Sequence, residues 1–560
     1  MKNQEQLFSD DKGLYFIPLG GSEQFGVNLN VYLSRGQMLA VDCGIGFADE
    51  KFPGIDLLLP DTSFLEDNRD ALQGIVITHA HEDHIGALAY VWDRFRCPVY
   101  CSPFTARVLR KKLEEQNLRK VKIHIITPGD CVDIGSFGVT FVPVSHSVPD
   151  TCSLIIDTQD GRVVHSGDWN LDPNPVLGAP TDGDAFKEAG DAGVLAYIGD
   201  STNAEVNGYS GSEADVAIGL EAEFRKCDGK IAVTTFSSNI GRVISILKAA
   251  HACDRQVGVI GRSLHRMIGC ARECGLLDGV PEIVSEEDLG YLPDDKIVVI
   301  VTGSQGEYRA ALGKISRGDF RDFRLQRGDS VIFSARAIPG NEIAINQIKN
   351  NLSAGGINII TPRDTKNIIH VSGHPCREEI AQMLQWVRPQ VVVPVHGERV
   401  QLDAHAEFAK DCQVPQTLVP SNGSVIKLAP GAPEIMDHIE TDVLAVDQKR
   451  IIKATHQSIV ARRKLQYTGT VHVALALDVR GELLGEPKLE TVGLIDIKNP
   501  GELQIEDNLY DEILDLLDDI DWEDRTDDDL VSDKIRIGVR RFCQNVLGIK
   551  PKASIHILRV

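Results

Sequence analysis

Four candidate metal ligands lie within six residues of one another, in the stretch His79-Ala80-His81-Glu82-Asp83-His84. Imidazole and carboxylate ligands together suit zinc or another divalent transition ion. An apolar, β-branched run at residues 75–77 precedes Thr78 and predicts a strand that ends there. A helix would place His79 and His81 on different faces, so we expect a loop that gathers the four side chains in one pocket. The competing interpretation, a polar loop rich in histidine by chance, is disfavoured by the density of the pattern.

Other candidate ligands stand at the ends of apolar stretches further along the chain. His146 follows residues 139–144, and Asp168 follows residues 163–164 with His165 between them. A lone histidine or aspartate in such a place is usually structural, but here the two supply a third imidazole and a carboxylate able to bridge two ions. Asp42 ends another apolar stretch and is either a turn residue or a support behind the metal loop. We expect His165 to pack or to hydrogen-bond behind the ligands rather than to ligate.

These spacings resemble the metallo-β-lactamase superfamily, in which two His/Asp sets hold a pair of metal ions in an αββα sandwich. The resemblance implies that one ion is held by His79, His81, His146 and a bridging Asp168. It implies that the other is held by Asp83, His84, Asp168 and one further histidine. No cysteine stands at a ligand position, which disfavours antibiotic hydrolysis.

Five motifs further along the chain narrow the resemblance. They read Gly-Asp-Ser-Thr-Asn (199–203), Phe-Ser-Ser-Asn (236–239), Thr-Gly-Ser-Gln-Gly-Glu (302–307), His-Val-Ser-Gly-His (370–374) and Pro-Val-His-Gly-Glu (394–398). Together with an α/β stretch of about 150 residues between the first and the last two, they resemble the β-CASP nucleases, and within these the ribonuclease J group. The resemblance covers residues 10–440 and, more loosely, the last hundred residues.

This narrower resemblance implies roles for further residues. His396 would complete the second metal site, and the catalytic residues would be Asp83, Asp200 and His374. Substrate phosphate would be bound by His370, Val371, Ser372, Gly373 and His374. Ser237, Ser238 and Asn239 would help to bind a 5′-monophosphate; a simple strand-to-helix turn is the alternative for these three.

Alternating strands and helices predict an α/β fold: a metallo-β-lactamase αββα sandwich with an inserted β-CASP α/β domain and a small C-terminal α/β domain. We expect the sandwich in residues 1–208 and 361–440, the insertion in 209–360, a linker in 441–457 and the last domain in 458–560. Helices are expected over residues 83–95, 105–115, 505–520 and 535–547. In the last domain we expect strands over 471–478, 492–496 and 554–558.

Composition describes an ordinary globular protein of several domains, with 42% hydrophobic and 25% charged residues among 560. No apolar run reaches the roughly 18 residues that span a bilayer. The first residues lack the layout of a signal peptide, and the cysteines are scattered, so we expect a reducing, cytoplasmic location without membrane contact. Of the net charge of −23, residues 502–533 carry −14, since fifteen acidic residues stand against Arg525. The acidic run is best explained as a solvated face.

The predicted function is metal-dependent ribonuclease activity in RNA maturation and decay: a 5′-to-3′ exoribonuclease with endonuclease activity. The expected cofactor is two Zn²⁺ per subunit, with Mn²⁺ or Mg²⁺ as alternatives. The expected partners are single-stranded RNA, preferentially 5′-monophosphorylated, further copies in a homodimer or homotetramer, and an RNA-degradation complex. Three alternatives remain: a β-CASP nuclease acting on DNA, a small-ester or thioester hydrolase with the same metal core, and a non-catalytic scaffold.

Overall fold

A computed structural model describes residues 13–338, 340–496 and 498–560. The first twelve residues of the predicted first domain therefore lie outside the described residues. The chain forms two compact units. The large unit comprises the chain up to Phe47 together with Leu57–Leu444, and the C-terminal unit comprises Ala48–Asp56 and Ala445–Val560. Within the described residues, no helix combines the length and the apolar character needed to cross a bilayer.

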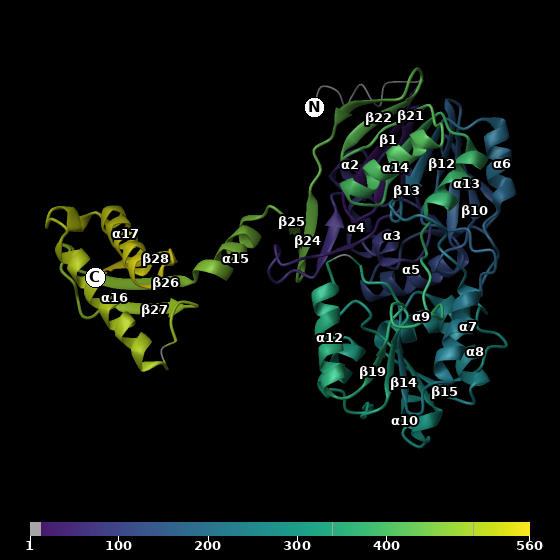
Figure 1. Cartoon of the computed structure of the whole chain (residues 1–560). Helices are drawn as coiled ribbons and strands as arrows, with labels where there is room; N and C mark the ends of the chain where they lie inside the picture. Colours follow the sequence, from purple (N-terminus) through teal and green to yellow (C-terminus); the bar gives the residue numbers. More distant parts are fainter. Residues whose placement is uncertain (1–12, 339, 497) are drawn as a thin grey trace. The chain divides into compact units, whose positions relative to one another are not determined.

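Two sheets packed face to face form the centre of the large unit (Figure 1). The eight-stranded sheet has the order β23-β22-β1-β2-β3-β6-β7-β8. Its strands are β1 (Leu14–Gly20), β2 (Leu29–Ser34), β3 (Gln37–Val41), β6 (Leu72–Ile77), β7 (Val99–Cys101), β8 (Ile123–Ile125), β22 (Ser424–Ala429) and β23 (Glu434–His438). Strands β3, β6, β7 and β8 are parallel neighbours, so helical crossovers must join them across one face of the sheet. The other sheet fills the inner face, which leaves the outer face for α4 (Leu88–Phe95) and α5 (Pro103–Glu115).

The seven-stranded sheet has the order β21-β20-β13-β12-β11-β10-β9. Its strands are β9 (Cys131–Ile134), β10 (Phe137–Pro143), β11 (Cys152–Thr158), β12 (Gly161–His165), β13 (Ala196–Asp200), β20 (Val391–Val395) and β21 (Gln416–Thr417). Side chains such as Phe141 and Leu154 meet Phe16 and Tyr32 of the other sheet in a fully buried core. The outer face packs on α6 (Gly183–Ala192), α13 (Arg377–Val387) and α14 (Arg399–Asp411). The predicted αββα sandwich is confirmed.

The inserted domain is built on a six-stranded, parallel sheet with the order β16-β15-β17-β14-β18-β19. The strands are β14 (Ile231–Thr234), β15 (Gln256–Ile260), β16 (Ile283–Val284), β17 (Ile297–Val301), β18 (Ser330–Phe333) and β19 (Asn358–Ile360). Apolar cores cover both faces, as a parallel sheet requires. Its helices include α7 (Glu213–Phe224), α8 (Ile240–Ala252), α9 (Arg262–Glu273), α11 (Ala311–Arg317) and α12 (Glu342–Ala354). The chain leaves the sandwich after β13 and returns through α13 to β20, and these two strands are parallel neighbours.

The expected helix over residues 83–95 is divided in two. The first part, α3, spans Glu82–Ile85, and α4 begins only at Leu88. The backbone carbonyl of Asp83 accepts a bond from the N–H of Asn28, and the N–H of Ala87 donates to the carbonyl of Cys43 at 2.9 Å. These tertiary hydrogen bonds replace the helical ladder, so the prediction of one continuous helix was wrong.

The C-terminal unit contains a three-stranded sheet, β27-β26-β28, covered on one face by two helices. Its elements are β26 (Thr470–Leu477), β27 (Lys488–Val492), β28 (Lys552–Arg559), α16 (Pro500–Asp518) and α17 (Asp528–Leu547). On α16 the side chains of Leu509, Ile513 and Leu517 are buried and that of Leu516 is half-buried, as in an amphipathic helix. The strand expected over residues 492–496 was misplaced, because β27 ends where that strand was to begin.

Candidate metal centre

The candidate ligands all lie just beyond the carboxyl ends of strands. His79 and His81 follow β6, His146 follows β10, and Asp168 follows β12. Strands β12, β13 and β20 lie side by side and parallel, with Asp200 of β13 paired to Val395 of β20. This register places the residues after the three strands at one edge of the sheet. Residues more than 300 positions apart in the sequence therefore meet in one site.

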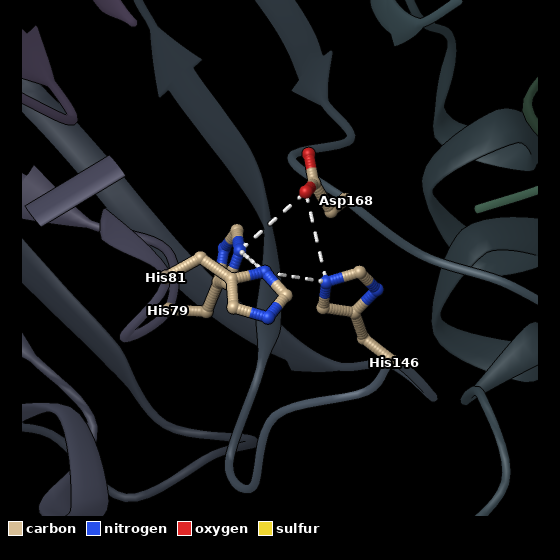
Figure 2. Close-up of side chains that lie close together, drawn as sticks. All are labelled: His79, His81, His146 and Asp168. Carbon is tan, nitrogen blue, oxygen red and sulfur yellow. Dashed lines mark hydrogen bonds and ion pairs between the residues drawn. The ribbon is translucent and has the colours of Figure 1, made fainter. Parts of the chain in front are cut away.

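One cluster consists of His79, His81, His146 and Asp168 (Figure 2). One ligand atom from each side chain lies within 4.8 Å of the others. Asp168 Oδ2 lies 3.5 Å from His79 Nε2 and 3.6 Å from His146 Nε2. His81 Nδ1 lies 3.1 Å from each of these two nitrogens. Three imidazoles and a carboxylate thus point at a common centre, which is the donor set of a transition-metal site.

A second cluster lies on the other side of Asp168. It contains Asp83, His84 and His396, and an overlapping group contains Asp168, Asp200, His374 and His396. Asp168 Oδ1 lies 3.3 Å from His84 Nε2 and 3.6 Å from His396 Nε2. The two oxygens of one carboxylate therefore face two separate groups of imidazoles.

The environment of Asp168 fits two bound cations. Both carboxylate oxygens are buried, and neither has a hydrogen-bond partner among the described residues. A buried polar group without a partner destabilises the folded protein by several kcal/mol, as an order of magnitude, and a buried charge costs more. A cation on each side would satisfy both oxygens at once. The donors that are present therefore fit a pair of divalent ions.

Each of the five imidazoles that face the centre is held by its second ring nitrogen. The partners are Thr78 Oγ1 for His79 (3.0 Å), Ser147 Oγ for His81 (3.3 Å), Asp42 Oδ2 for His84 (2.8 Å), the Gly373 carbonyl for His146 (2.7 Å) and Asn28 Oδ1 for His396 (3.0 Å). Outer partners of this kind fix the tautomer and the orientation of metal-binding histidines. Asp42 also accepts bonds from the backbone N–H and the hydroxyl of Thr78, so its contacts are those of a support behind the loop.

The charge states of the histidines differ across the site. Burial lowers the pKa of His79 and His81 well below the usual value and that of His146 to about 4, so these rings are neutral, as metal ligands must be. Burial alone would also lower the pKa of His84, but the carboxylates of Asp168 and Asp83 outweigh it and raise that pKa.

His374 and Asp200 form a separate pair beside the clusters. The Nδ1–H of His374 donates to Asp200 Oδ2 at 2.8 Å, and Asp200 Oδ1 accepts bonds from the backbone N–H and the hydroxyl of Thr202. Burial opposes the charge on His374, but the carboxylates of Asp200 and Asp168 outweigh it and raise its pKa to about 9. Asp200 thus orients the His374 ring and favours its protonated form.

Four of the eight residues predicted to bind substrate line one cleft next to the clusters. The cleft is lined by His146, Asn239, Val371, Ser372 and Gly373 among others. Asn239 is also the N-cap of α8 and accepts a bond from the backbone N–H of Arg242, so the strand-to-helix turn considered for residues 237–239 is present. Ser237 and Ser238 are half-buried in that turn and do not line the cleft.

Sequence analysis missed the residues that hold this loop in place. Asn203 is buried, and its Nδ2 donates to Ser372 Oγ at 2.9 Å and to the His374 carbonyl at 3.1 Å. His370 Nδ1 faces the guanidinium of Arg242 at 3.3 Å, and burial together with the charges of Arg242 and Arg336 lowers its pKa to about 3. Asn203 lies in one of the five motifs, three positions after Asp200, which could have drawn attention to it. Nothing in the sequence distinguishes Arg242 in this way.

His165 lies behind the ligands, as expected. Its Nδ1 lies 2.9 Å from the Tyr32 hydroxyl, and burial lowers its pKa to about 4. The ring is therefore neutral and bonds to Tyr32 of β2. This contact agrees with a packing role.

Four family models match the chain. A beta-lactamase superfamily domain matches residues 39–182, and the ribonuclease J beta-CASP domain matches residues 228–352. A Zn-dependent metallo-hydrolase RNA specificity domain matches residues 360–415, and the ribonuclease J C-terminal domain matches residues 458–560. A crystal structure of a protein of unknown function from Enterococcus faecalis matches with a TM-score of 0.53 at 16% identity, covering 74% of this chain and 100% of that chain. That likeness concerns the fold alone.

Curated relatives match over almost the whole length. A ribonuclease J from Sinorhizobium meliloti is 43% identical over 557 residues, which is 99% of this chain and 98% of the relative. A ribonuclease J from Synechocystis is 37% identical and covers 88% of this chain and 77% of its own length. A third, from Mycolicibacterium smegmatis, is 38% identical, with 78% of each chain covered. With two clusters of metal ligands at the edge of a metallo-β-lactamase sandwich, a β-CASP insertion and these relatives, the chain belongs to the ribonuclease J family of metal-dependent ribonucleases.

Proposed function

We propose that the chain is a two-metal 5′-to-3′ exoribonuclease that prefers 5′-monophosphorylated, single-stranded RNA and also cleaves internally. The observation that carries this proposal is the carboxylate of Asp168, whose two oxygens face separate groups of imidazoles. The residues that would hold the ions are His79, His81, Asp83, His84, His146, Asp168 and His396. Zinc is the ion that a site with five imidazoles favours, with Mn²⁺ or Mg²⁺ as alternatives.

Divalent ions held by these residues would lower the pKa of a water molecule and neutralise the charge that develops on a phosphodiester. The carboxylate of Asp83 is 31% exposed, whereas that of Asp168 is 1% exposed. Asp83 is therefore the acidic group that entering water meets, and it accepts the proton that the attacking water loses.

His374 acts on the leaving group or on the phosphate, whereas Asp83 acts on the attacking water. Asp200 accepts the Nδ1–H of His374, and its carboxylate favours a second proton on the ring. This second proton, at Nε2, is available to the leaving 3′-oxygen or to a phosphate oxygen whose charge increases in the transition state. Asp200 thus positions His374 and stabilises its charge.

The 370–374 loop and the α8 turn would receive the substrate phosphates. Ser372 and Gly373 line the cleft together with Asn239, and Asn203 holds the loop in place. Burial and two arginines keep His370 neutral, so it donates a hydrogen bond rather than a charge. The residues that we expect to contact phosphate are His370, Val371, Ser372, Gly373, His374, Ser237, Ser238 and Asn239.

The decisive experiment uses one 3′-labelled RNA and a DNA of the same sequence, each with a 5′-monophosphate, a 5′-triphosphate or a 5′-hydroxyl. Each is incubated with chelated protein to which zinc, manganese or magnesium has been added back. Stepwise shortening from the 5′ end of the monophosphate RNA is expected, and zinc is expected to restore most activity. Equal attack on DNA, or indifference to the 5′ end, would contradict the proposal.

Further proposals concern the assembly and setting of the protein. The C-terminal unit has its own core and contributes none of the metal-site residues, so we assign it to self-association in a homodimer or homotetramer. All twelve cysteines are free, which favours a reducing compartment such as the cytoplasm. Domain limits at residues 208, 360, 440 and 457, and membership of an RNA-degradation complex, remain proposals.

A further inference from the structure

The motif Thr-Gly-Ser-Gln-Gly-Glu (302–307) lies in the β-CASP domain and supplies none of the metal-site residues. Its central residue, Gln305, is buried and binds a neighbouring segment through both ends of its amide. The side-chain NH₂ of Gln305 donates to the Arg336 carbonyl at 2.9 Å, and its Oε1 accepts the backbone N–H of Ile338 at 2.8 Å. Gln305 therefore holds the backbone at Arg336 itself and on its C-terminal side.

The other end of the same segment is fixed at Ser334, directly after β18. The Ser334 hydroxyl donates to the Ile369 carbonyl at 2.7 Å, and Arg242 donates to both the hydroxyl and the carbonyl of Ser334. Arg242 is itself fully buried and bound to both oxygens of Glu213. Residues 334–338 are thus held beside the 370–374 loop.

Arg336 lies between these two attachments with its side chain exposed. Its Nη1 donates to Asn203 Oδ1 at 3.1 Å, and Asn203 in turn holds Ser372 and the His374 carbonyl. In the part of the chain that the structure describes, the guanidinium forms no ion pair with a carboxylate. Its charge is close enough to the loop to contribute to the low pKa of His370.

Arg336 is thus an exposed cation that is held in place and has no carboxylate partner among the described residues, in a chain with a net charge of −23. A guanidinium has five N–H donors in a rigid fork and suits phosphate oxygens. Nη1 of Arg336 donates to Asn203, and the other N–H donors of the guanidinium are available to a ligand. Because the attachment orients the side chain before binding, little conformational entropy is lost when an anion binds.

We propose that Arg336 binds a phosphate group of the RNA backbone next to the phosphate that is cleaved, and that Gln305 holds it in position to do so. The proposal rests on the proposed ribonuclease function and adds a substrate contact supplied by the β-CASP domain. The contact is electrostatic and independent of base sequence. It therefore contributes to binding rather than to the chemical step.

The test measures the affinity of the chelated full-length protein for a fluorescent, 5′-monophosphorylated single-stranded RNA at several KCl concentrations. Loss of one phosphate contact is expected to reduce the slope of log K against log salt by about 0.7. Arg336→Gln should show this reduction and bind RNA about tenfold more weakly, whereas Arg336→Lys should keep the slope. Arg321→Gln, at another exposed arginine of the same domain, should behave like the unchanged protein.

The KM and kcat of the metal-loaded protein show whether Arg336 binds RNA or only supports the structure. Arg336→Gln should raise KM about tenfold and leave kcat within about twofold, with unchanged metal content. An unchanged salt slope, or a fall in kcat at constant KM, would overturn the proposal, because the residue would then act on the loop through Asn203. If the unchanged protein neither binds nor cleaves the RNA, the proposed function itself fails, whatever the variants do.

Discussion

At the level of single residues, the site depends on how each imidazole is oriented. His81 differs from its neighbours because it presents Nδ1 to the centre, whereas His79 and His146 present Nε2. Its Nε2 lies 3.3 Å from Ser147 Oγ, which follows directly after His146 in the chain. The first cluster is therefore held together by contacts between the loop after β6 and the loop after β10.

Replacing His81 tests whether this cluster binds metal. We expect His81→Ala to lower the metal content by one ion per chain and to lower turnover by more than about 100-fold, since even residues behind metal ligands contribute 10- to 100-fold. Metal analysis and RNA cleavage measure the two effects, and circular dichroism verifies the fold. His265→Ala, an exposed histidine paired with Glu286, is the matched control. Full activity of a metal-replete His81→Ala would refute the two-metal assignment.

His374 is expected to behave differently, because its Nδ1–H donates to Asp200 and its ring lies beside the two clusters rather than in them. His374→Ala should lower kcat by about 10²- to 10⁴-fold, the range of general acid–base contributions, and leave the metal content unchanged. Asp200→Asn should lower kcat in the same direction, since it removes the negative charge that faces the Nδ1–H of His374. Loss of bound metal from His374→Ala would instead identify it as a ligand.

At the level of elements, the 370–374 loop connects the proposed phosphate contacts with a candidate metal ligand. The Gly373 carbonyl accepts the Nδ1–H of His146 at 2.7 Å, so the loop orients a candidate metal ligand. A Cβ at position 373 would lie 2.8 Å from Cε1 and 2.9 Å from Nδ1 of the same ring. Only glycine allows this close approach.

Gly373→Ala should therefore displace His146 and weaken metal binding as well as RNA binding. We expect the apparent zinc affinity to fall by about 10- to 100-fold, as when a partner behind a metal ligand is lost, and KM for RNA to rise. Competition with a chromogenic chelator measures the first effect. Gly138→Ala is the control, because its nearest neighbours lie at 3.7 Å and leave room for a methyl group. Unchanged zinc affinity in Gly373→Ala would show that the loop does not orient the ligand.

The elements also show what the sequence could and could not predict. Strands ending at candidate ligands were predictable because apolar, β-branched runs stop directly before His79 and His146. The break between α3 and α4 could not be predicted. It depends on hydrogen bonds to Asn28 and Cys43, and the sequence does not show that these residues lie next to the helix. The C-terminal strand β27 was misplaced by a few residues, since residues 493–495 are apolar but lie beyond the paired register with β26.

The supporting residues were harder to predict than the candidate ligands. Histidine and aspartate in a dense pattern have few structural roles, so His79 and His84 were conspicuous in the sequence. Asn28 and Arg242 are ordinary polar residues whose roles arise only from tertiary contacts with His396 and His370. Side-chain types thus predict chemistry well, whereas the partners that orient those side chains emerge only from the fold.

At the level of the whole molecule, the ligands tie together remote parts of the large unit. They come from positions between His79 and His396, while the C-terminal unit has a separate core of its own and contributes no residue to the clusters. A cation that binds only the folded large unit stabilises it by an amount set by concentration and affinity, about 2.7 kcal/mol at 100 times Kd. The C-terminal unit gains nothing from that binding directly.

Calorimetry of the full chain should therefore resolve two transitions that respond differently to metal. Chelation is expected to lower the Tm of the large unit by several degrees and to leave that of the C-terminal unit unchanged. Adding zinc back should reverse the shift, whereas His81→Ala should unfold near the lower temperature with or without chelator. A single transition, or equal shifts of both, would mean that the two units unfold together, and that the division seen in the structure does not extend to stability.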